Sequence, residues 1–315
     1  MIKKCVLSLV FLLAGWGLFA EPTPRPLVIF SQCNSAEPYR AAQNASFKQL
    51  WSQTPVVFEI LDAGQDNERQ VAQIDAAIGR KPRLLIVAPN ERVPLSAVMG
   101  RAMAAGIPVI CLERDIVNPA NYTTWVRSDN YTIGVLVGLY IVDFLKSKYG
   151  EPRGRIVDLR GLAGVEGEVA REAGAFDVLK RYPNIVKVRQ SYAGWIQRKA
   201  ENTMAVILKL EPEIDVVYGH NDPMAVGAYH AAEAVGRERS MIFVGVDGLN
   251  GPGGGIEQVK NGQLYATFVY PLCTDQAYAV GLKLLADSSF VPEKQYMVKS
   301  SIVLPDTAKQ IYRAK

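Results

Sequence analysis

Two apolar runs separated by a helical segment constrain the fold more than any other feature of this chain. Runs 216–218 and 242–246 are predominantly apolar, and the alanine-rich segment 224–235 between them has helical character. A crossover of this length makes two strands parallel. Asp222 and Asp247 follow the two runs. We therefore expect them side by side at the carboxyl ends of neighbouring strands, where open α/β sheets bind small ligands.

The same alternation of apolar strands and helices runs through the whole chain. Apolar strands joined by helices indicate a parallel sheet that is covered on both faces. We expect an α/β protein with two Rossmann-like lobes, built on parallel sheets and joined by a multi-strand hinge. The main expected strands are 27–30, 56–61, 84–88, 109–112, 155–159, 186–190, 216–218, 242–246 and 265–269. The expected lobes are 21–127 plus 271–299, and 128–270 plus 300–315.

Residues 1–20 have the features of a secretory signal peptide. Lys3 and Lys4 supply positive charge, an apolar stretch follows, and the chain turns polar after Ala20. The apolar stretch is too short for a stable membrane span. Trp16 stands where a lipid-bearing cysteine would have to be. We therefore expect an exported, soluble protein with cleavage near Ala20 and no lipid anchor.

The charge pattern does not indicate a nucleic-acid or membrane partner. The formal charge of +4 becomes +2 when Lys3 and Lys4 are subtracted, and the remaining acids and bases are interspersed. No later segment reaches the roughly 18 unbroken apolar residues that a membrane-spanning helix needs. We expect neither nucleic-acid binding nor insertion of the mature chain into a membrane.

The cysteine, histidine and glycine residues do not form motifs that indicate metal, redox or catalytic chemistry. Cys33, Cys111 and Cys273 form no CxxC pair, although a disulfide between Cys33 and Cys111 is possible in an oxidising compartment. The chain has only two histidines, which argues against a histidine-rich metal site. The glycine run 251–255 lacks the GK[ST] ending of a phosphate loop. We expect no cofactor, no metal and no catalytic residue.

Several short motifs occur in a fixed order along the chain. They are Phe30-Ser31-Gln32, Tyr39-Arg40, Ile107-Pro108-Val109, Glu113-Arg114, Ser128-Asp129-Asn130, Arg171-Glu172-Ala173-Gly174, His220-Asn221-Asp222-Pro223-Met224 and Val246-Asp247-Gly248. Together they resemble periplasmic sugar-binding proteins of the ribose/galactose type, which share their fold with the ligand-sensing cores of LacI-like repressors. Within this group, the chain most resembles the galactofuranose-binding branch.

The resemblance implies a type I periplasmic binding protein, in which the ligand lies between two lobes that close by a hinge. It also implies a monosaccharide ligand, a periplasmic location, the permease of an ABC importer as partner, and no enzymatic activity. By position in the motifs, it nominates as ligand contacts Tyr39, Arg40, Arg114, Asn221, Asp222 and Asp247.

The chemistry of these and neighbouring side chains suits a sugar. A carboxylate accepts hydrogen bonds from two vicinal hydroxyls, arginine offers several donors in a planar fork, and an aromatic ring stacks on the apolar face of a sugar. The full set of candidate ligand-binding residues is Tyr39, Arg40, Glu113, Arg114, Arg171, Trp195, Asn221, Asp222 and Asp247.

Simpler roles compete with ligand binding at several of these positions. Asp222 could cap the helix that follows it, Asp247 could shape a turn, and the arginines could be solvated surface residues. The chain also departs from the family pattern. Glu113 stands where such proteins usually carry Asp, and Gly194 precedes Trp195 where an acidic residue is common.

Two other function classes are compatible with the same cleft. A sensor subunit would report a sugar or autoinducer-like polyol to a membrane receptor, and a glycoside-processing enzyme would use the carboxylate pair as acid and nucleophile. A repressor core is disfavoured, because a signal peptide stands in place of a DNA-binding head.

Overall fold

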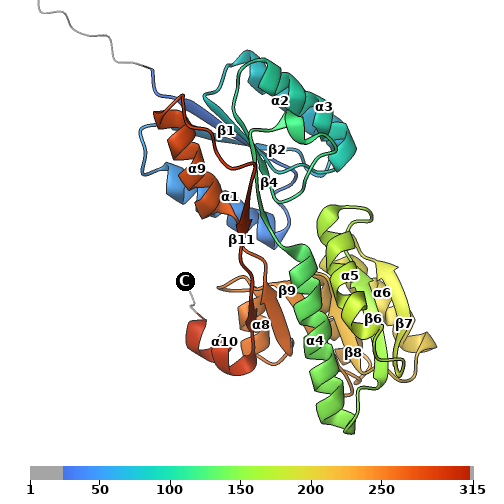
Figure 1. Cartoon of the computed structure of the whole chain (residues 1–315). Coiled ribbons are helices and arrows are strands. Elements are labelled where there is room, and N and C mark those ends of the chain that lie inside the picture. Colours follow the sequence, from blue (N-terminus) through green and yellow to red (C-terminus); the bar gives the residue numbers. More distant parts are fainter. Residues whose placement is uncertain (1–23, 313–315) are drawn as a thin grey trace, which may run out of the picture.

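Two α/β lobes make up the molecule, joined by a narrow crossing (Figure 1). The computed structural model describes residues 24–312, so the predicted signal peptide 1–20 and its cleavage near Ala20 lie outside the described residues. Each lobe contains a six-stranded sheet. The predicted fold class, with two Rossmann-like lobes on parallel sheets, is confirmed.

The first lobe is built on a sheet with the strand order β11-β5-β4-β3-β1-β2, in which all pairs are parallel. Helices α2 and α3 pack on one face of this sheet, and α1 and α9 on the other. The strands are β1 (Leu27–Gln32), β2 (Val57–Asp62), β3 (Leu84–Val87), β4 (Val109–Leu112), β5 (Thr124–Ser128) and β11 (Gln295–Val298). The helices are α1 (Pro38–Trp51), α2 (Asn67–Gly79), α3 (Arg92–Ala104), the short 3-10 helix η1 (Pro119–Asn121) and α9 (Thr274–Ala286).

The second lobe has the order β12-β10-β9-β8-β6-β7, with only the β10–β12 pair antiparallel. Helices α4 and α5 cover one face, and α6, α7 and α8 the other. The strands are β6 (Gly154–Arg160), β7 (Ile185–Tyr192), β8 (Val216–Gly219), β9 (Ile242–Asp247), β10 (Ala266–Val269) and β12 (Ser301–Val303). The helices are α4 (Asn130–Tyr149), α5 (Glu166–Leu179), α6 (Gln197–Leu210), α7 (Asp222–Glu233), α8 (Gly255–Lys260) and α10 (Pro305–Ile311).

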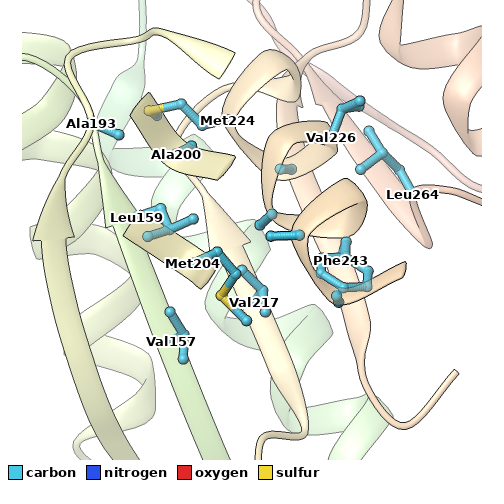
Figure 2. Packing of buried hydrophobic residues seen from close by; sticks show 14 of the residues in the cluster. Val157, Leu159, Ala193, Ala200, Met204, Val217, Met224, Val226, Phe243 and Leu264 are labelled. Carbon is cyan, nitrogen blue, oxygen red and sulfur yellow. The ribbon is translucent and has the colours of Figure 1, made fainter. Parts of the chain in front are cut away.

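An apolar core lies between the sheet of the second lobe and the helices α6 and α7. Val157 of β6, Val217 of β8 and Phe243 of β9 point toward Met204 of α6 and the neighbouring helix α7 (Figure 2). All four side chains are buried. Because such burial contributes roughly 25 cal/mol per Å² of apolar surface, this layer stabilises the packing of α6 and α7 on the sheet.

The chain passes between the two lobes at three places, which are the β5–α4 junction, segment 270–273, and the step from β11 to β12. The Ser128 hydroxyl donates a 2.9 Å hydrogen bond to the Val298 carbonyl, which ties two of these crossings together. The sheet membership of β11 and β12 supports the proposed division into 21–127 plus 271–299 and 128–270 plus 300–315.

Some elements had no clear signal in the sequence. Strand β5 reads Thr-Trp-Val-Arg-Ser, which mixes polar and apolar residues without a clean period. Strands β11 and β12 are short sheet-edge strands, and both are partly exposed, so they lack an apolar run. Neighbouring strands, rather than local sequence, determine these three strands.

The three cysteines among the described residues are buried and free. The disulfide considered between Cys33 and Cys111 is therefore not formed. The Cys33 thiol lies near the Arg114 guanidinium at 3.9 Å, and the Cys111 thiol donates to the Arg114 carbonyl at 3.1 Å. Within residues 24–312, no helix is long and apolar enough to cross a membrane.

Candidate ligand-binding cleft

A cleft of about 440 Å³ lies between the two lobes, and both contribute to its walls. It contains eight of the nine sequence-predicted site residues, and Asp222 is the one that does not line it. The lining residues are Glu37, Tyr39, Arg40, Glu113, Arg114, Val165, Glu166, Gly167, Arg171, Trp195, Asn221, Asp247 and Tyr270.

A buried ion pair forms the centre of the first-lobe wall. Arg40, in the first turn of α1, places its Nη1 atom 2.7 Å from the Glu113 carboxylate, which follows β4. Gln43 donates to the same carboxylate and also, at 2.9 Å, to the Leu272 carbonyl on a crossing segment. Buried charges persist when they are paired in this way. The pair therefore presents a fixed, polar surface to the cleft.

Arg114 also lines the first-lobe wall, and only some of its N–H donors are used by the protein. Its Nη1 atom donates to the carbonyl oxygens of Asn90 at 2.8 Å and Pro89 at 3.4 Å. Within the described residues, no hydrogen bond uses its Nε or Nη2 atoms. An arginine held by backbone carbonyls has a fixed fork, so the remaining donors are available to a ligand oxygen.

Aromatic rings and a third arginine, Arg171, form the wall of the second lobe. Arg171 of α5 lies over the Tyr270 ring at 4.5 Å and donates to Asn130 and to the His220 carbonyl. The Tyr270 ring is 5.2 Å from the Tyr39 ring of the first lobe. The aromatic contact therefore connects the two lobes beside the crossing segment.

Trp195 adopts an unusual backbone conformation at the edge of the cleft. Its φ angle is +71°, in the left-handed region, and its ring packs directly against Gly161. The Asn221 amide donates to the Trp195 carbonyl at 3.1 Å, while its side-chain oxygen accepts from Met224 N and so caps α7. Asn221, and not Asp222, therefore has the capping role that we considered for Asp222.

Asp222 lies behind the wall and organises the loops around it. Its carboxylate accepts from the Gly248 amide at 2.8 Å and from the Thr267 hydroxyl at 2.7 Å. It is packed so tightly that a Cβ on Gly245 or Gly255 would meet its oxygens at 2.2 or 1.8 Å. Burial raises the pKa of Asp222 to about 7. In this structure it supports the cleft wall and does not line it.

Asp247 faces the cleft at the carboxyl end of β9 with a φ angle of +131°. Burial raises its pKa well above the usual range, and the nearby Asp222 charge adds to that shift, while Arg171 opposes it. The two acids of the strand–helix–strand unit are thus electrostatically coupled, although only Asp247 is on the cleft wall.

The cleft residues outside the sequence-predicted set are Glu37, Val165, Glu166, Gly167 and Tyr270. Glu166 accepts from Arg127 of β5 at 2.9 Å and from Asn130 at 2.7 Å, so it joins a second-lobe helix to the lobe junction. Burial raises the pKa of Glu166. Its position at the first residue of α5, after a glycine-containing turn, was the only signal in the sequence.

A polar cluster outside the cleft lies in the second lobe. Among the described residues, Asp158, Glu172 and His220 are the group whose potential metal-ligand atoms all lie within 4.8 Å of one another. The Lys187 ammonium lies 3.3 Å from Asp158 and also contacts Glu172, and His220 Nε2 is 3.1 Å from Asp158. Because the Lys187 ammonium already pairs with both carboxylates, we interpret the cluster as an ion-pair network.

Residues 28–284 match the family described as periplasmic binding protein domain. The chain belongs to this family. The matched region includes every residue of the cleft wall. The type I periplasmic binding protein fold that the resemblance implied is therefore confirmed.

Three proteins that are similar to this chain are named for the sugars that they bind. The galactofuranose-binding protein YtfQ of Escherichia coli (strain K12) is 29% identical over 296 residues, which are 90% of each chain. A D-apiose import binding protein of Paraburkholderia graminis is 30% identical over 84% of this chain and 82% of that protein. The solved fructose binding periplasmic domain of a hybrid two-component system has a TM-score of 0.84 and 33% identity, over 91% of this chain and 93% of that chain.

Proposed function

We propose that this chain is a periplasmic solute-binding protein that captures a monosaccharide in the interlobe cleft and delivers it to an ABC importer. The arrangement of buried guanidinium and carboxylate groups from both lobes around one cleft carries this proposal. An unmatched buried donor or acceptor costs about 1–3 kcal/mol, so such walls favour a ligand that is rich in hydroxyl groups. Relatives named for galactofuranose, apiose and fructose support the sugar class.

Both lobes contribute ligand contacts, so a sugar touches all of them only when the lobes are closed. The ligand therefore shifts the population toward the closed state, with the three crossings as the hinge. The closed molecule presents a surface that the open one lacks, and we propose that the importer permease recognises that surface.

A panel of sugars tests the ligand class. Thermal-shift and calorimetric titrations with pentoses, hexoses and their furanose forms are expected to give at least one saturable response, because ligand that binds only the folded state raises its stability. If no sugar in the panel shifts the melting temperature or gives heat, the transport proposal is wrong as stated.

The importer role has its own test. The sugar-loaded protein is expected to stimulate the ATPase activity of its reconstituted ABC importer, and the sugar-free protein to stimulate it much less. Mass spectrometry of protein from the periplasm checks the location and the proposed cleavage near Ala20.

A second candidate function is a sensor subunit, favoured by the likeness to the fructose binding domain of a two-component system. In that case the sugar-loaded protein would activate a membrane receptor kinase and not an ATPase. The family consists of binding proteins, so we assign no catalytic activity to the chain and drop the glycoside-processing alternative.

A further inference from the structure

His220 is a fully buried residue that lies behind the second-lobe wall of the cleft. It directly follows β8, and its backbone amide donates to the Leu159 carbonyl of β6 at 2.9 Å. Its side chain does not line the cleft, although that of the next residue, Asn221, does. A buried imidazole needs polar partners, so its surroundings indicate what the ring does.

The His220 ring faces an acid on the neighbouring strand. Its Nε2 atom lies 3.1 Å from Asp158 Oδ1, and both side chains are at most 2% exposed. Asp158 Oδ1 forms no hydrogen bond with the described residues, and Oδ2 lies 3.3 Å from the Lys187 ammonium. Burial alone would raise the pKa of Asp158, but the nearby His220 and Lys187 hold it below the usual range. Electrostatic attraction to Asp158 therefore holds the ring against β6.

The backbone of His220 holds a cleft arginine. The His220 carbonyl accepts a hydrogen bond from Arg171 Nη1, and Arg171 Nε donates to Asn130 at 2.9 Å. These two bonds fix the plane of the Arg171 guanidinium, which lines the cleft. Without the contact between the ring and Asp158, the carbonyl of the same residue would be freer to turn. Arg171 would then lose one of its two anchors.

Asn221 is anchored independently of the His220 ring. Its side-chain oxygen accepts from the Met224 amide at 3.0 Å, and its side-chain nitrogen donates to the Trp195 carbonyl at 3.1 Å. A change at the His220 ring should therefore reach the cleft mainly through Arg171 and not through Asn221.

We propose that His220 is a positioning residue for sugar binding: with its ring held by Asp158, its carbonyl sets the guanidinium of Arg171 in the cleft. This inference rests on the proposed sugar-binding function and extends the binding machinery to two residues that do not touch the ligand. The contact between His220 and Asp158 then contributes to sugar affinity and not only to stability.

Calorimetric titrations of the full mature chain test the inference with the tightest binder among fructose, galactose, ribose and arabinose. His220→Leu replaces the ring with an apolar side chain and is expected to weaken binding at least fivefold. His220→Gln keeps an N–H donor for Asp158 and is expected to bind within twofold of the unaltered protein. Asp158→Val removes the contact from the other strand with a residue suited to a buried strand, and is expected to weaken binding at least threefold. It decides the test alone if His220→Leu does not fold.

A control variant separates positioning from stability. Ile141→Ala truncates a fully buried side chain of α4 in the second-lobe core, and Ile141 does not line the cleft. Its melting temperature is expected to fall, because the truncation leaves a cavity. Its sugar affinity is expected to stay within twofold of that of the unaltered protein, because the variant remains folded at the temperature of the titration.

A double-mutant cycle tests the route through Arg171. Arg171→Met removes the guanidinium and keeps an unbranched side chain. In that background, His220→Leu is expected to weaken binding by less than a further twofold, because no guanidinium is left to position.

The outcomes separate the inference from the function on which it rests. If a sugar binds and both His220→Leu and Asp158→Val leave its affinity unchanged, the positioning role is overturned while sugar binding stands. The role is equally overturned if His220→Gln binds as weakly as His220→Leu, or if the full loss persists in the Arg171→Met background. If no sugar binds the unaltered protein, the proposed function and the inference fail together.

Discussion

At the scale of single residues, the cleft is built from side chains whose backbones are strained. Glu113, Trp195 and Asp247 have φ angles of +59°, +71° and +131°, and all three line the cleft. Non-glycine residues rarely adopt such angles and persist there only when the surroundings hold them. These backbone conformations direct the three side chains into the space between the lobes. The fold therefore sets their directions before a ligand binds.

The first prediction concerns Asp247. Asp247→Ala is expected to weaken sugar binding at least tenfold, or about 1.4 kcal/mol, because a buried ligand hydroxyl loses its partner. Calorimetry with the sugar found in the panel measures the change. Asp275→Asn, at an exposed position in α9, is the control and should bind like the unaltered protein. Equal affinity in Asp247→Ala would refute its assignment to the site.

The second prediction uses a pair of glycines. A Cβ on Gly161 would meet ring carbons of Trp195 at 2.1–2.4 Å, so Gly161→Ala is expected to displace the ring and weaken ligand binding several-fold. Gly79, near the end of α2, has nothing within 4 Å of such a Cβ. Gly79→Ala is therefore expected to leave affinity unchanged and to stabilise the fold by about 0.4–1 kcal/mol. Trp195 fluorescence and calorimetry read out both variants, and an undisturbed Trp195 signal in Gly161→Ala would contradict the packing.

The sequence predicted much of the cleft because most of its residues follow strands. Arg114 and Asn221 come shortly after β4 and β8, and Asp247 is the last residue of β9, so strand order alone brings them to one edge of each sheet. Glu166 escaped prediction because its partners are remote in the sequence: Arg127 lies in the first lobe, and Asn130 begins α4. No local pattern reports a contact of that kind. For the same reason, the sequence could not show whether Asp222 lies on the wall or behind it.

At the scale of elements, Asp222 ties α7, β9 and β10 together through two hydrogen bonds. Asp222 is the first residue of α7. Its carboxylate oxygens accept hydrogen bonds from Gly248, which follows β9, and from Thr267 in β10. Asp247 depends on this tie, because the Gly248 amide that bonds to Asp222 follows it directly. Asp222 therefore stabilises the loop through its hydrogen bonds, but its burial makes the ionised carboxylate unfavourable.

The third prediction is a pH dependence of stability. Burial raises the pKa of Asp222 to about 7 in the folded protein, against about 3.9 for an unfolded aspartate. The folded state therefore holds this proton more tightly. The resulting stabilisation is complete below about pH 4 and is lost as the pH rises through 7. The melting temperature is expected to fall between pH 5 and pH 8.

The variant Asp222→Asn tests whether ionisation of Asp222 causes this pH dependence. The variant cannot ionise, so its melting temperature is expected to fall less between pH 5 and pH 8 than that of the unaltered protein. Some slope remains, because burial and the nearby Asp158 also raise the pKa of Glu172 to about 7. An identical slope in both proteins would show that Asp222 is not the group responsible.

At the scale of the whole molecule, one partly buried ion pair spans the two lobes. Arg127, on the first-lobe strand β5, lies 2.9 Å from Glu166, which begins α5 of the second lobe. Glu166 also lines the cleft and bonds to Asn130, whose oxygen accepts from Arg171. These contacts link the cleft wall to the segments that must bend when the lobes move.

The fourth prediction addresses this link. Arg127→Ala removes an ion pair between the lobes and is expected to weaken sugar binding three- to tenfold, because a ligand that requires the closed state binds less tightly when that state is less populated. Small-angle X-ray scattering should show a larger radius of gyration at the same sugar concentration. Arg101→Ala breaks a pair with Asp75 inside the first lobe and serves as control. Unchanged affinity and size in Arg127→Ala would remove this pair from the closing motion.

The step from β11 to β12 also determines when each lobe can finish folding. Strand β11 closes the edge of the first sheet and β12 the edge of the second, and only residues 299–300 separate them. Strand β5 must therefore wait for a partner about 170 residues later in synthesis, as the Ser128–Val298 bond shows. Pairing across such distances is slow, because loop-closure entropy opposes it. The two lobes have separate cores, yet the short segment that holds β11 and β12 supplies an edge strand to both sheets.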